Sequence, residues 1–186
     1  MNSENTFEGM SRKTKDPGRR FLPLRIEGEA SLIDLHRIVC RNLPANHGGR
    51  PLFSFYREGS DTRLMIDTGI GKSPSSPPDP GARCTLAVRL HPVRRSGSVE
   101  RVVPKNDQAD WARTKLVESG FDIDWIAFCD FSREIFGKDR LSIASLVIVA
   151  TGTVRDSLRA RAAMDNGIGR MKAFGFGMLL TDLDRP

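Results

Sequence analysis

The apolar pattern in the first part of the chain predicts a strand, a helix and a hairpin in succession. Residues 21–28 are mainly apolar and read as a strand, and the proline inside it places that strand at a sheet edge or a bulge. Residues 31–43 then read as a helix, for which Ser31 is a suitable N-cap. Apolar and polar positions alternate in residues 52–58 and continue in residues 62–67 after a Gly-Ser-Asp turn, which predicts a β-hairpin.

The second half of the chain predicts the order strand, helix, strand, strand, helix, strand. The strands are expected at about 84–91, 124–129, 143–151 and 173–180, and the helices at about 107–119 and 155–165. Asn106 or Asp107 suits the N-cap of the first helix, and Gly120 suits its end. Residues 92–106 and 131–141 are expected to be loops. This order implies a sheet with helices on one face, the βαββαβ ferredoxin-like pattern.

The distribution of proline, glycine and serine divides the chain into two domains. Residues 1–18 are polar and charged, which predicts a disordered tail, and residues 69–82 are too rich in proline, serine and glycine for regular structure, which predicts a linker. The N-terminal domain, residues 19–68, lacks a second helix and a fourth strand, whereas residues 83–186 hold the full pattern. The predicted fold class is therefore α+β, with two tandem ferredoxin-like (RRM-like) domains of which the N-terminal one is reduced.

Composition predicts the charge of a binding partner and the cellular compartment of the protein. The formal net charge of +6 and the sequence pI near 9.6 suit an anionic partner, although a solvated basic surface would give the same values. Cys40, Cys84 and Cys129 show no pairing pattern, which fits buried thiols in a reducing cytoplasm better than disulfides or zinc ligands. We find no apolar run of about 18 residues and no signal-peptide pattern, so we expect a cytoplasmic protein without a membrane span.

Residues 166–180, NGIGRMKAFGFGMLL, combine glycines, cations and aromatics near the end of the chain. The glycines are Gly167, Gly169, Gly175 and Gly177. Glycine lets a backbone approach a ligand closely, Arg170 and Lys172 would attract phosphate, and an aromatic ring can stack on a base. The predicted order of helix, glycines and strand is the reverse of a dinucleotide-binding fingerprint and argues against such a site. The alternative is a helix stop followed by strand glycines that serve packing.

The same run resembles the glycine-rich loop of CRISPR repeat-processing endoribonucleases of the RAMP superfamily, in particular of the CasE subunit of Cascade, whose chains end in a GIG-x-x-KAFG-x-GLL pattern. Three further segments are similar to family motifs and follow in the family's order. LIDLHR (32–37) resembles the first-helix histidine motif, LAVRLHPVRR (86–95) a basic strand, and DQADWARTKLVESGF (107–121) a Trp-containing helix. The resemblance covers roughly residues 20–182 and implies neither a cofactor nor a metal.

The resemblance implies that His36 is catalytic. In the family a histidine on the first helix moves a proton while the ribose 2′-OH attacks the scissile phosphate, and histidine suits proton transfer near neutral pH. On a helical wheel, however, His36 falls within an apolar arc, so the alternative is a core histidine. Both interpretations hold if this helix face lines a cleft between the domains.

One family position is changed in this chain. Ile33 stands where CasE-like enzymes commonly carry a tyrosine, three residues before the histidine. Lys172, in the glycine-rich run, and Arg37, beside the histidine, are the candidates for the missing proton or for positive charge. The sequence leaves the choice between them open.

Clustered cations and the family motifs also predict the RNA-binding residues. These are Arg89, His91, Arg94, Arg95, Arg101, Lys105, Arg155, Arg159, Gly167, Gly169, Arg170, Gly175 and Gly177. Trp111 and Trp125 are interpreted as core residues, and at least one of Phe174 and Phe176 is expected in the core. His47 is expected in an exposed loop.

By resemblance, we expect a metal-independent endoribonuclease that cuts the hairpin of a CRISPR repeat RNA and keeps the product (the crRNA) as a Cascade subunit. Its partners would then be that RNA and other Cascade subunits, including a backbone subunit at the 3′ end of the crRNA. The alternative of another class is a non-catalytic cap that only binds the hairpin. A small-molecule-binding module of the same fold would leave the clustered arginines unexplained.

Overall fold

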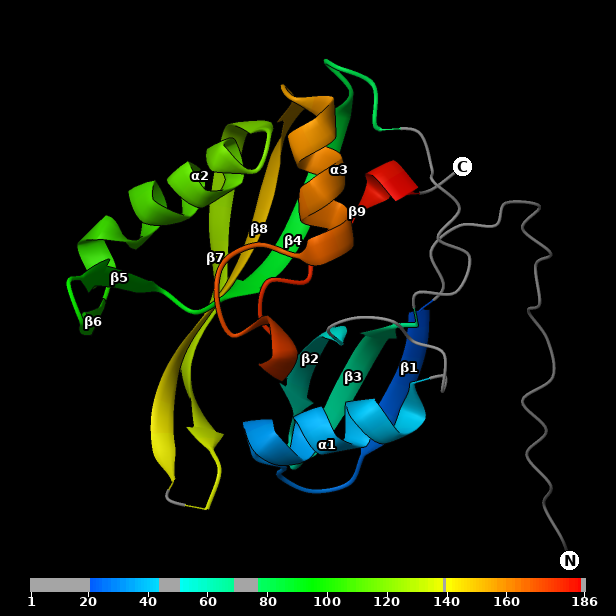
Figure 1. Cartoon of the computed structure of the whole chain (residues 1–186), viewed down its shortest axis with the longest axis vertical. Helices are drawn as coiled ribbons and strands as arrows, with labels where there is room; N and C mark the ends of the chain where they lie inside the picture. The colour runs from blue at the N-terminus through cyan, green and yellow to red at the C-terminus, as the bar shows by residue number, and fades with distance from the viewer. Residues whose placement is uncertain (1–20, 44–50, 69–76, 139, 185–186) are drawn as a thin grey trace, which may run out of the picture.

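The computed structural model of the chain describes residues 21–43, 51–68, 77–138 and 140–184. The predicted tail, the first part of the predicted linker and His47 lie outside these residues. The described residues form two units, each with its own antiparallel sheet and its own helices, which lie against each other (Figure 1).

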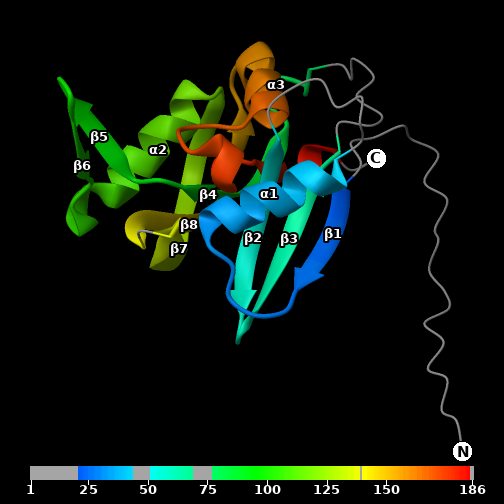
Figure 2. The same ribbon diagram turned by 60° about the horizontal axis from the view of Figure 1, so that its bottom comes forward.

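The N-terminal unit has a βαββ arrangement. Its elements are β1 (Phe21–Ile26), α1 (Leu32–Asn42), β2 (Leu52–Glu58) and β3 (Asp61–Asp67). The strands form a sheet of order β1-β3-β2, so β1, which contains Pro23, is an edge strand as the proline predicts. Helix α1 lies along one face of this sheet (Figure 2). Ser31 caps α1 by accepting a hydrogen bond from the backbone N–H of Asp34 at 3.3 Å, as predicted.

The C-terminal unit has the predicted βαββαβ core. Its elements are β4 (Arg83–Leu90), α2 (Gln108–Glu118), β7 (Phe121–Phe136), β8 (Leu141–Val154), α3 (Ser157–Asn166) and β9 (Leu180–Thr181). The sheet order β7-β8-β4-β9 is the ferredoxin-like order, and α2 and α3 share one core with it, in which Leu116, Leu146 and Ala160 are fully buried. The predicted fold class of two tandem ferredoxin-like domains, the first of them reduced, is confirmed.

The hairpin of β7 and β8 is much longer than predicted. The segment 131–141 was expected to be a loop, but β7 continues to Phe136 and β8 begins at Leu141. Bulges in β7 between Ile123 and Trp125 and between Phe128 and Asp130 shift the alternation of buried and exposed positions, which hides the strand from a period-two search. The same shift leaves Trp125 54% exposed, so its predicted core role is wrong, whereas that of Trp111, 8% exposed, is confirmed.

Two further predictions of local structure are wrong. Residues 92–106, expected as a loop, contain a two-stranded ribbon of β5 (Val93–Ser96) and β6 (Val99–Val102). Nearly all of its side chains are exposed, so it has no apolar face that the sequence would show. The strand expected at 173–180 is replaced by the 3-10 helix η2 (Lys172–Phe174) and a loop, because Gly175 has φ +88°, which a β-strand does not allow.

The core of the N-terminal unit is completed by distant segments. Phe53 and Phe55 of β2 pack with the fully buried Phe176 of the glycine-rich run, and Phe136 and Ile143 of the long hairpin pack at the edge of the same cluster. Phe176 thereby fulfils the expected core role. The two units are joined by a shared apolar cluster as well as by the chain.

The three thiols are free. Cys84 is buried as predicted, whereas Cys40 and Cys129 are exposed, which corrects the expectation for them. Burial raises the pKa of the Cys84 thiol to about 11. Among the described residues, no helix is both long and apolar enough to cross a membrane.

Candidate active site

His36 lies where α1 meets the glycine-rich run. Its side chain is half-buried, and Nδ1 donates a hydrogen bond to the backbone carbonyl of Ala173 at 2.7 Å. The centroid of the Phe174 ring lies 5.3 Å from that of the imidazole. Because a carbonyl oxygen can only accept, Nδ1 carries the proton, and in the neutral ring Nε2 is left with a free lone pair. His36 is therefore half-buried, as its place in the apolar arc suggests, and its Nε2 can still accept a proton, as the predicted chemistry requires.

Cys40 contacts the same imidazole from the next turn of α1. Its Sγ lies 3.6 Å from Nε2 and 4.0 Å from Nδ1, and its thiol is exposed. On the helical wheel Cys40 falls in the same apolar arc as His36, but no role was predicted for it. The signal was present, since residues four apart on a helix are neighbours on its surface.

Ile33, which replaces the family tyrosine, packs against the turn of the long hairpin. A Cβ built on Gly137 would lie 2.8 Å from Ile33 Cδ1, so the turn and the isoleucine are in close contact. This position therefore holds the hairpin against α1 and supplies no proton.

The two candidates for a second proton group lie in different surroundings. Lys172 is half-buried, and its Nζ donates to the carbonyl of Gly167 at 2.7 Å. Lys172 directly precedes Ala173, whose carbonyl holds His36. Arg37 is exposed and pairs with Asp34 at 3.4 Å on the same helix. The hydrogen bond from Ser31 to the Asp34 carboxylate, helped by Arg37, lowers the pKa of Asp34. Of the two, Lys172 is the cation integrated into the glycine-rich run.

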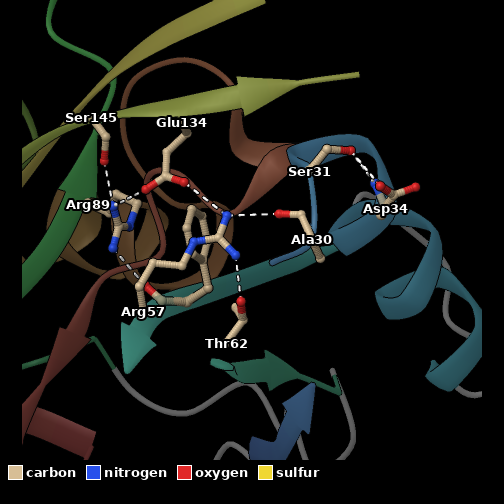
Figure 3. A network of polar contacts seen from close by, with 9 residues as sticks. Ala30, Ser31, Asp34, Arg57, Thr62, Arg89, Glu134 and Ser145 are labelled. Atoms are coloured by element: carbon tan, nitrogen blue, oxygen red, sulfur yellow. Dashed lines mark hydrogen bonds and ion pairs between the residues drawn. The ribbon is translucent and has the colours of Figure 1, made fainter. Parts of the chain in front are cut away.

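A buried network of charges connects the two units (Figure 3). Glu134 of β7 pairs with Arg57 of β2 at 3.0 Å and with Arg89 of β4 at 3.4 Å. Arg89 also donates to Ser145 Oγ at 2.5 Å and to the carbonyl of Phe55 at 2.8 Å. Burial lowers the pKa of Arg89, and the attraction of Glu134 opposes this shift. The network fixes the distal half of the long hairpin on the N-terminal sheet.

Arg57 extends the network to the start of the histidine helix. Its Nη2 donates to the carbonyl of Ala30 at 2.8 Å, directly before the N-cap Ser31, as Figure 3 shows. Its Nη1 donates to Thr62 Oγ1 at 2.5 Å. The hairpin therefore contacts the beginning of α1 through both Arg57 and the turn at Gly137.

Arg89 was predicted to bind RNA, and the structure argues against this role. Its side chain is 5% exposed, its guanidinium lies 4.2 Å over the Phe55 ring, and both of its terminal nitrogens, Nη1 and Nη2, donate to groups inside the protein. The alternation in β4 places Arg89 on the face opposite Val88 and Leu90, but it does not show that the N-terminal unit covers that face. Arg89 is a structural cation at the junction of the units.

A groove of about 1100 Å³ runs along this junction. It is lined by residues of both units, among them Ile33, Arg37, Tyr56, Arg133, Lys138 and Arg140. Its cations outnumber its carboxylates, and His36 does not belong to its lining. The groove and the histidine thus adjoin different parts of α1.

Packing inside the protein accounts for most of the glycines that were predicted to contact RNA. Gly167, Gly175 and Gly177 are buried, and Gly169 alone of the four is exposed. A Cβ at Gly175 would lie 2.6 Å from Phe55 Cδ1. The N–H of Gly177 is donated to the carbonyl of Arg89 at 2.7 Å. The three buried glycines therefore serve close packing, the alternative that the sequence left open.

The predicted basic contacts fall into two groups. Arg94, Arg95 and Arg101 are exposed on the β5–β6 ribbon, where Arg94 lies directly opposite Arg101, and Lys105 is exposed just after the ribbon. An ion pair between Arg170 and Glu100 joins this ribbon to the glycine-rich run. The second group, Arg155 and Arg159, lies at the start of α3, where they pair with Asp122 at 3.6 Å and Asp156 at 3.2 Å. His91 is half-buried and donates from Nδ1 to the carbonyl of Ala144 at 2.8 Å.

The described residues include no cluster of three or more histidine, cysteine, aspartate or glutamate side chains with the geometry of a metal site. The chemistry that this arrangement can perform is proton transfer at Nε2 of His36, beside the thiol of Cys40 and the cation of Lys172.

The fold has close counterparts among solved structures. A CRISPR endoribonuclease Cse3 bound to a 19-nucleotide RNA has a TM-score of 0.70 and 17% identity, with 87% of this chain and 99% of that chain covered. Cas6e from Escherichia coli K-12 has a TM-score of 0.69 and 15% identity, with 87% and 97% covered. A chain of a CRISPR RNA-guided surveillance complex has a TM-score of 0.60 and 20% identity, with 87% and 97% covered. These likenesses establish a shared fold.

The sequence itself carries the family assignment. No curated protein matches the chain. A family model described as CRISPR associated protein matches residues 78–182, which is more than half of the chain and includes the basic strand, the Trp111 helix and the glycine-rich run. The resemblance seen in the sequence motifs is thereby confirmed, and the chain belongs to the CRISPR associated protein family.

Proposed function

We propose that the protein is a metal-independent endoribonuclease that cuts the hairpin of a CRISPR repeat RNA and retains the product as a subunit of Cascade. The observation that carries this proposal is the placement of His36. Its Nδ1 is fixed by the Ala173 carbonyl of the glycine-rich run, while Nε2 keeps a lone pair for proton transfer. This hydrogen bond joins the histidine to the segment that carries the strongest family motif.

The chemistry follows from one imidazole and one ribose hydroxyl. Nε2 of His36 takes the proton of the 2′-OH, the 2′-oxygen forms a bond to phosphorus, and the bond from phosphorus to the 5′-oxygen breaks. The leaving 5′-oxygen takes up a proton from water, so the products are a 5′-hydroxyl and a 2′,3′-cyclic phosphate. Lys172 would stabilise the negative charge that develops on the phosphate.

The RNA partner is supported by charge and by the similar structures. The β5–β6 ribbon presents Arg94, Arg95 and Arg101 without an apolar face, a composition suited to phosphate contacts. The similar Cse3 structure is described as bound to RNA, and a second similar chain belongs to a surveillance complex guided by CRISPR RNA. We infer that this chain binds crRNA in the cytoplasm together with other Cascade subunits, including a backbone subunit at the 3′ end of the crRNA.

A second candidate is a non-catalytic cap that binds the same hairpin while another nuclease cuts it. Ile33 favours this candidate, because its position supplies an apolar contact with the hairpin turn where the family carries a tyrosine. Both candidates use the same fold and the same basic ribbon, and they differ in whether the bound RNA is cut.

The two candidates are separated by incubating the protein with a labelled repeat hairpin in EDTA under single-turnover conditions. The matched control is the same RNA with one 2′-deoxyribose at the scissile position, which can bind but cannot attack. Cleavage of the ribose form alone supports the proposal. Binding of both RNAs without cleavage supports the cap, and absence of binding contradicts both.

A further inference from the structure

The position of Cys40 beside His36 is defined by two distances. Sγ lies 3.6 Å from Nε2 and 4.0 Å from Nδ1. A sulfur in line with the Nε2 lone pair would be farther from Nδ1 by the width of the ring. The nearly equal distances therefore place the thiol at the side of the imidazole, and the lone pair stays available.

The imidazole is held by three contacts from two segments. The carbonyl of Ala173 binds Nδ1, the ring of Phe174 lies 5.3 Å away, and Cys40 approaches from α1 itself. Phe174 is in turn fixed by an edge contact with Phe136, at 4.9 Å between ring centroids. Ile33 supplies no polar group on the preceding turn, whereas Cys40 contacts the histidine from the following turn.

We propose that Cys40 is a positioning residue for His36, which holds the imidazole with Nε2 open towards the RNA. This inference rests on the proposed nuclease function. It carries a second consequence, since any group attached to the exposed sulfur would lie against Nε2. A thiol reagent attached to Cys40 should therefore slow proton transfer without touching the basic ribbon.

The contact can be tested without RNA. Iodoacetamide alkylates a thiolate, so that a carbon–sulfur bond forms, iodide leaves and the thiol proton goes to solvent. The imidazole covers one side of the sulfur, so Cys40 should react faster in His36→Ala than in the wild type. Cys129 is the internal control because it is equally free and exposed, and its rate should not change. The buried Cys84 should stay unlabelled.

The role in positioning is tested by a double-mutant cycle on single-turnover cleavage. Cys40→Ala should lower cleavage about ten-fold, within the range by which misplacing a reacting group slows a reaction, and Cys40→Ser should recover most of it. In the His36→Ala background Cys40→Ala should have no further effect, whereas a merely structural role would lower both backgrounds alike. Alkylated wild type should lose cleavage but not hairpin binding, and Cys40→Ser should be protected from this loss.

The outcomes distinguish this inference from the proposed function. An uncut hairpin together with His36-dependent labelling of Cys40 would contradict the nuclease and support the thiol–imidazole contact. Labelling that is independent of His36 would overturn the contact, whatever the RNA assay gives. Full cleavage by Cys40→Ala or by the alkylated wild type would overturn the positioning role.

Discussion

At the scale of single residues, the proposed RNA cleavage depends on the imidazole of His36. His36→Ala should lower single-turnover cleavage by roughly 10²–10⁴-fold, the usual contribution of one proton-transfer group. Hairpin affinity should change little, because phosphate contacts dominate it. Cleavage rates and filter binding of the same preparation check both statements. Cleavage near the wild-type rate would rule out His36 as the proton-transfer group, and a loss of folding would assign it to the core.

Ile33 offers a gain-of-function test at the same scale. Ile33→Tyr restores the family residue beside a groove of about 1100 Å³ that can accommodate the larger ring. We expect faster single-turnover cleavage with unchanged hairpin affinity. The melting temperature of the variant serves as control, because Ile33 also contacts the hairpin turn at Gly137. An unchanged or slower rate in a stably folded variant would show that the site does not need this group.

The sequence predicted a candidate functional residue where a family motif marks the position, and missed one where no motif does. His36 was found from a helix motif, whereas Cys40 was passed over although it lies one turn away. The predictions for Arg89 and Trp125 failed for different reasons. Arg89 lies on a face of β4 that the N-terminal unit covers, and the sequence of β4 does not show this contact. Trp125 lies beside a bulge of β7, which shifts the alternation of buried and exposed positions.

At the scale of elements, the Glu134 network should account for much of the stability of the junction. Glu134 is 6% exposed between Arg57 and Arg89. Glu134→Ala leaves the buried Arg89 and the partly exposed Arg57 without their carboxylate, which should cost about 3–5 kcal/mol of unfolding free energy. Urea unfolding measures this loss. Glu58→Ala is the matched control, because its pair with Arg63 is exposed and should contribute about 0–1 kcal/mol.

The glycine-rich run provides a second test at this scale, with a control in the same loop. Gly175→Ala should destabilise the protein by about 1–3 kcal/mol beyond Gly169→Ala, as expected for overpacking. Both positions have positive φ, but a Cβ at Gly175 meets Phe55 at 2.6 Å, whereas one at Gly169 meets Leu90 at 3.6 Å. Thermal unfolding of the two variants measures the difference. Equal stabilities would restore the expectation that this glycine serves RNA instead of packing.

Element types were predicted where an apolar face repeats and missed where it does not. The helices α1, α2 and α3 were found because each presents apolar residues to a core and has a capping residue or glycine at one end. The ribbon β5–β6 escaped because its side chains are nearly all exposed. The final strand was overpredicted because glycines at positive φ occur inside an apolar run that otherwise resembles a strand.

At the scale of the whole molecule, the charge distribution predicts how salt weakens RNA binding. Arg101→Ala on the ribbon should lower the slope of log affinity against log salt by about one unit or less, as expected for one lost phosphate contact. Arg63→Ala, on the exposed side of the N-terminal sheet, is the control and should leave the slope unchanged. Folding should not suffer in Arg101→Ala, because Arg94 lies directly opposite and like charges across a ribbon repel. Equal slopes for wild type and Arg101→Ala would remove the ribbon from the RNA interface.

The location of Phe176 has a consequence for how the protein is made. During translation the N-terminal unit leaves the ribosome first, and N-terminal domains usually fold before the rest of a chain is synthesised. Here the core around Phe53 and Phe55 also contains Phe176, which is synthesised more than 100 residues later. The nascent N-terminal unit therefore remains incomplete until Phe176 has been synthesised, so the histidine helix and the segment that holds its imidazole become ordered together.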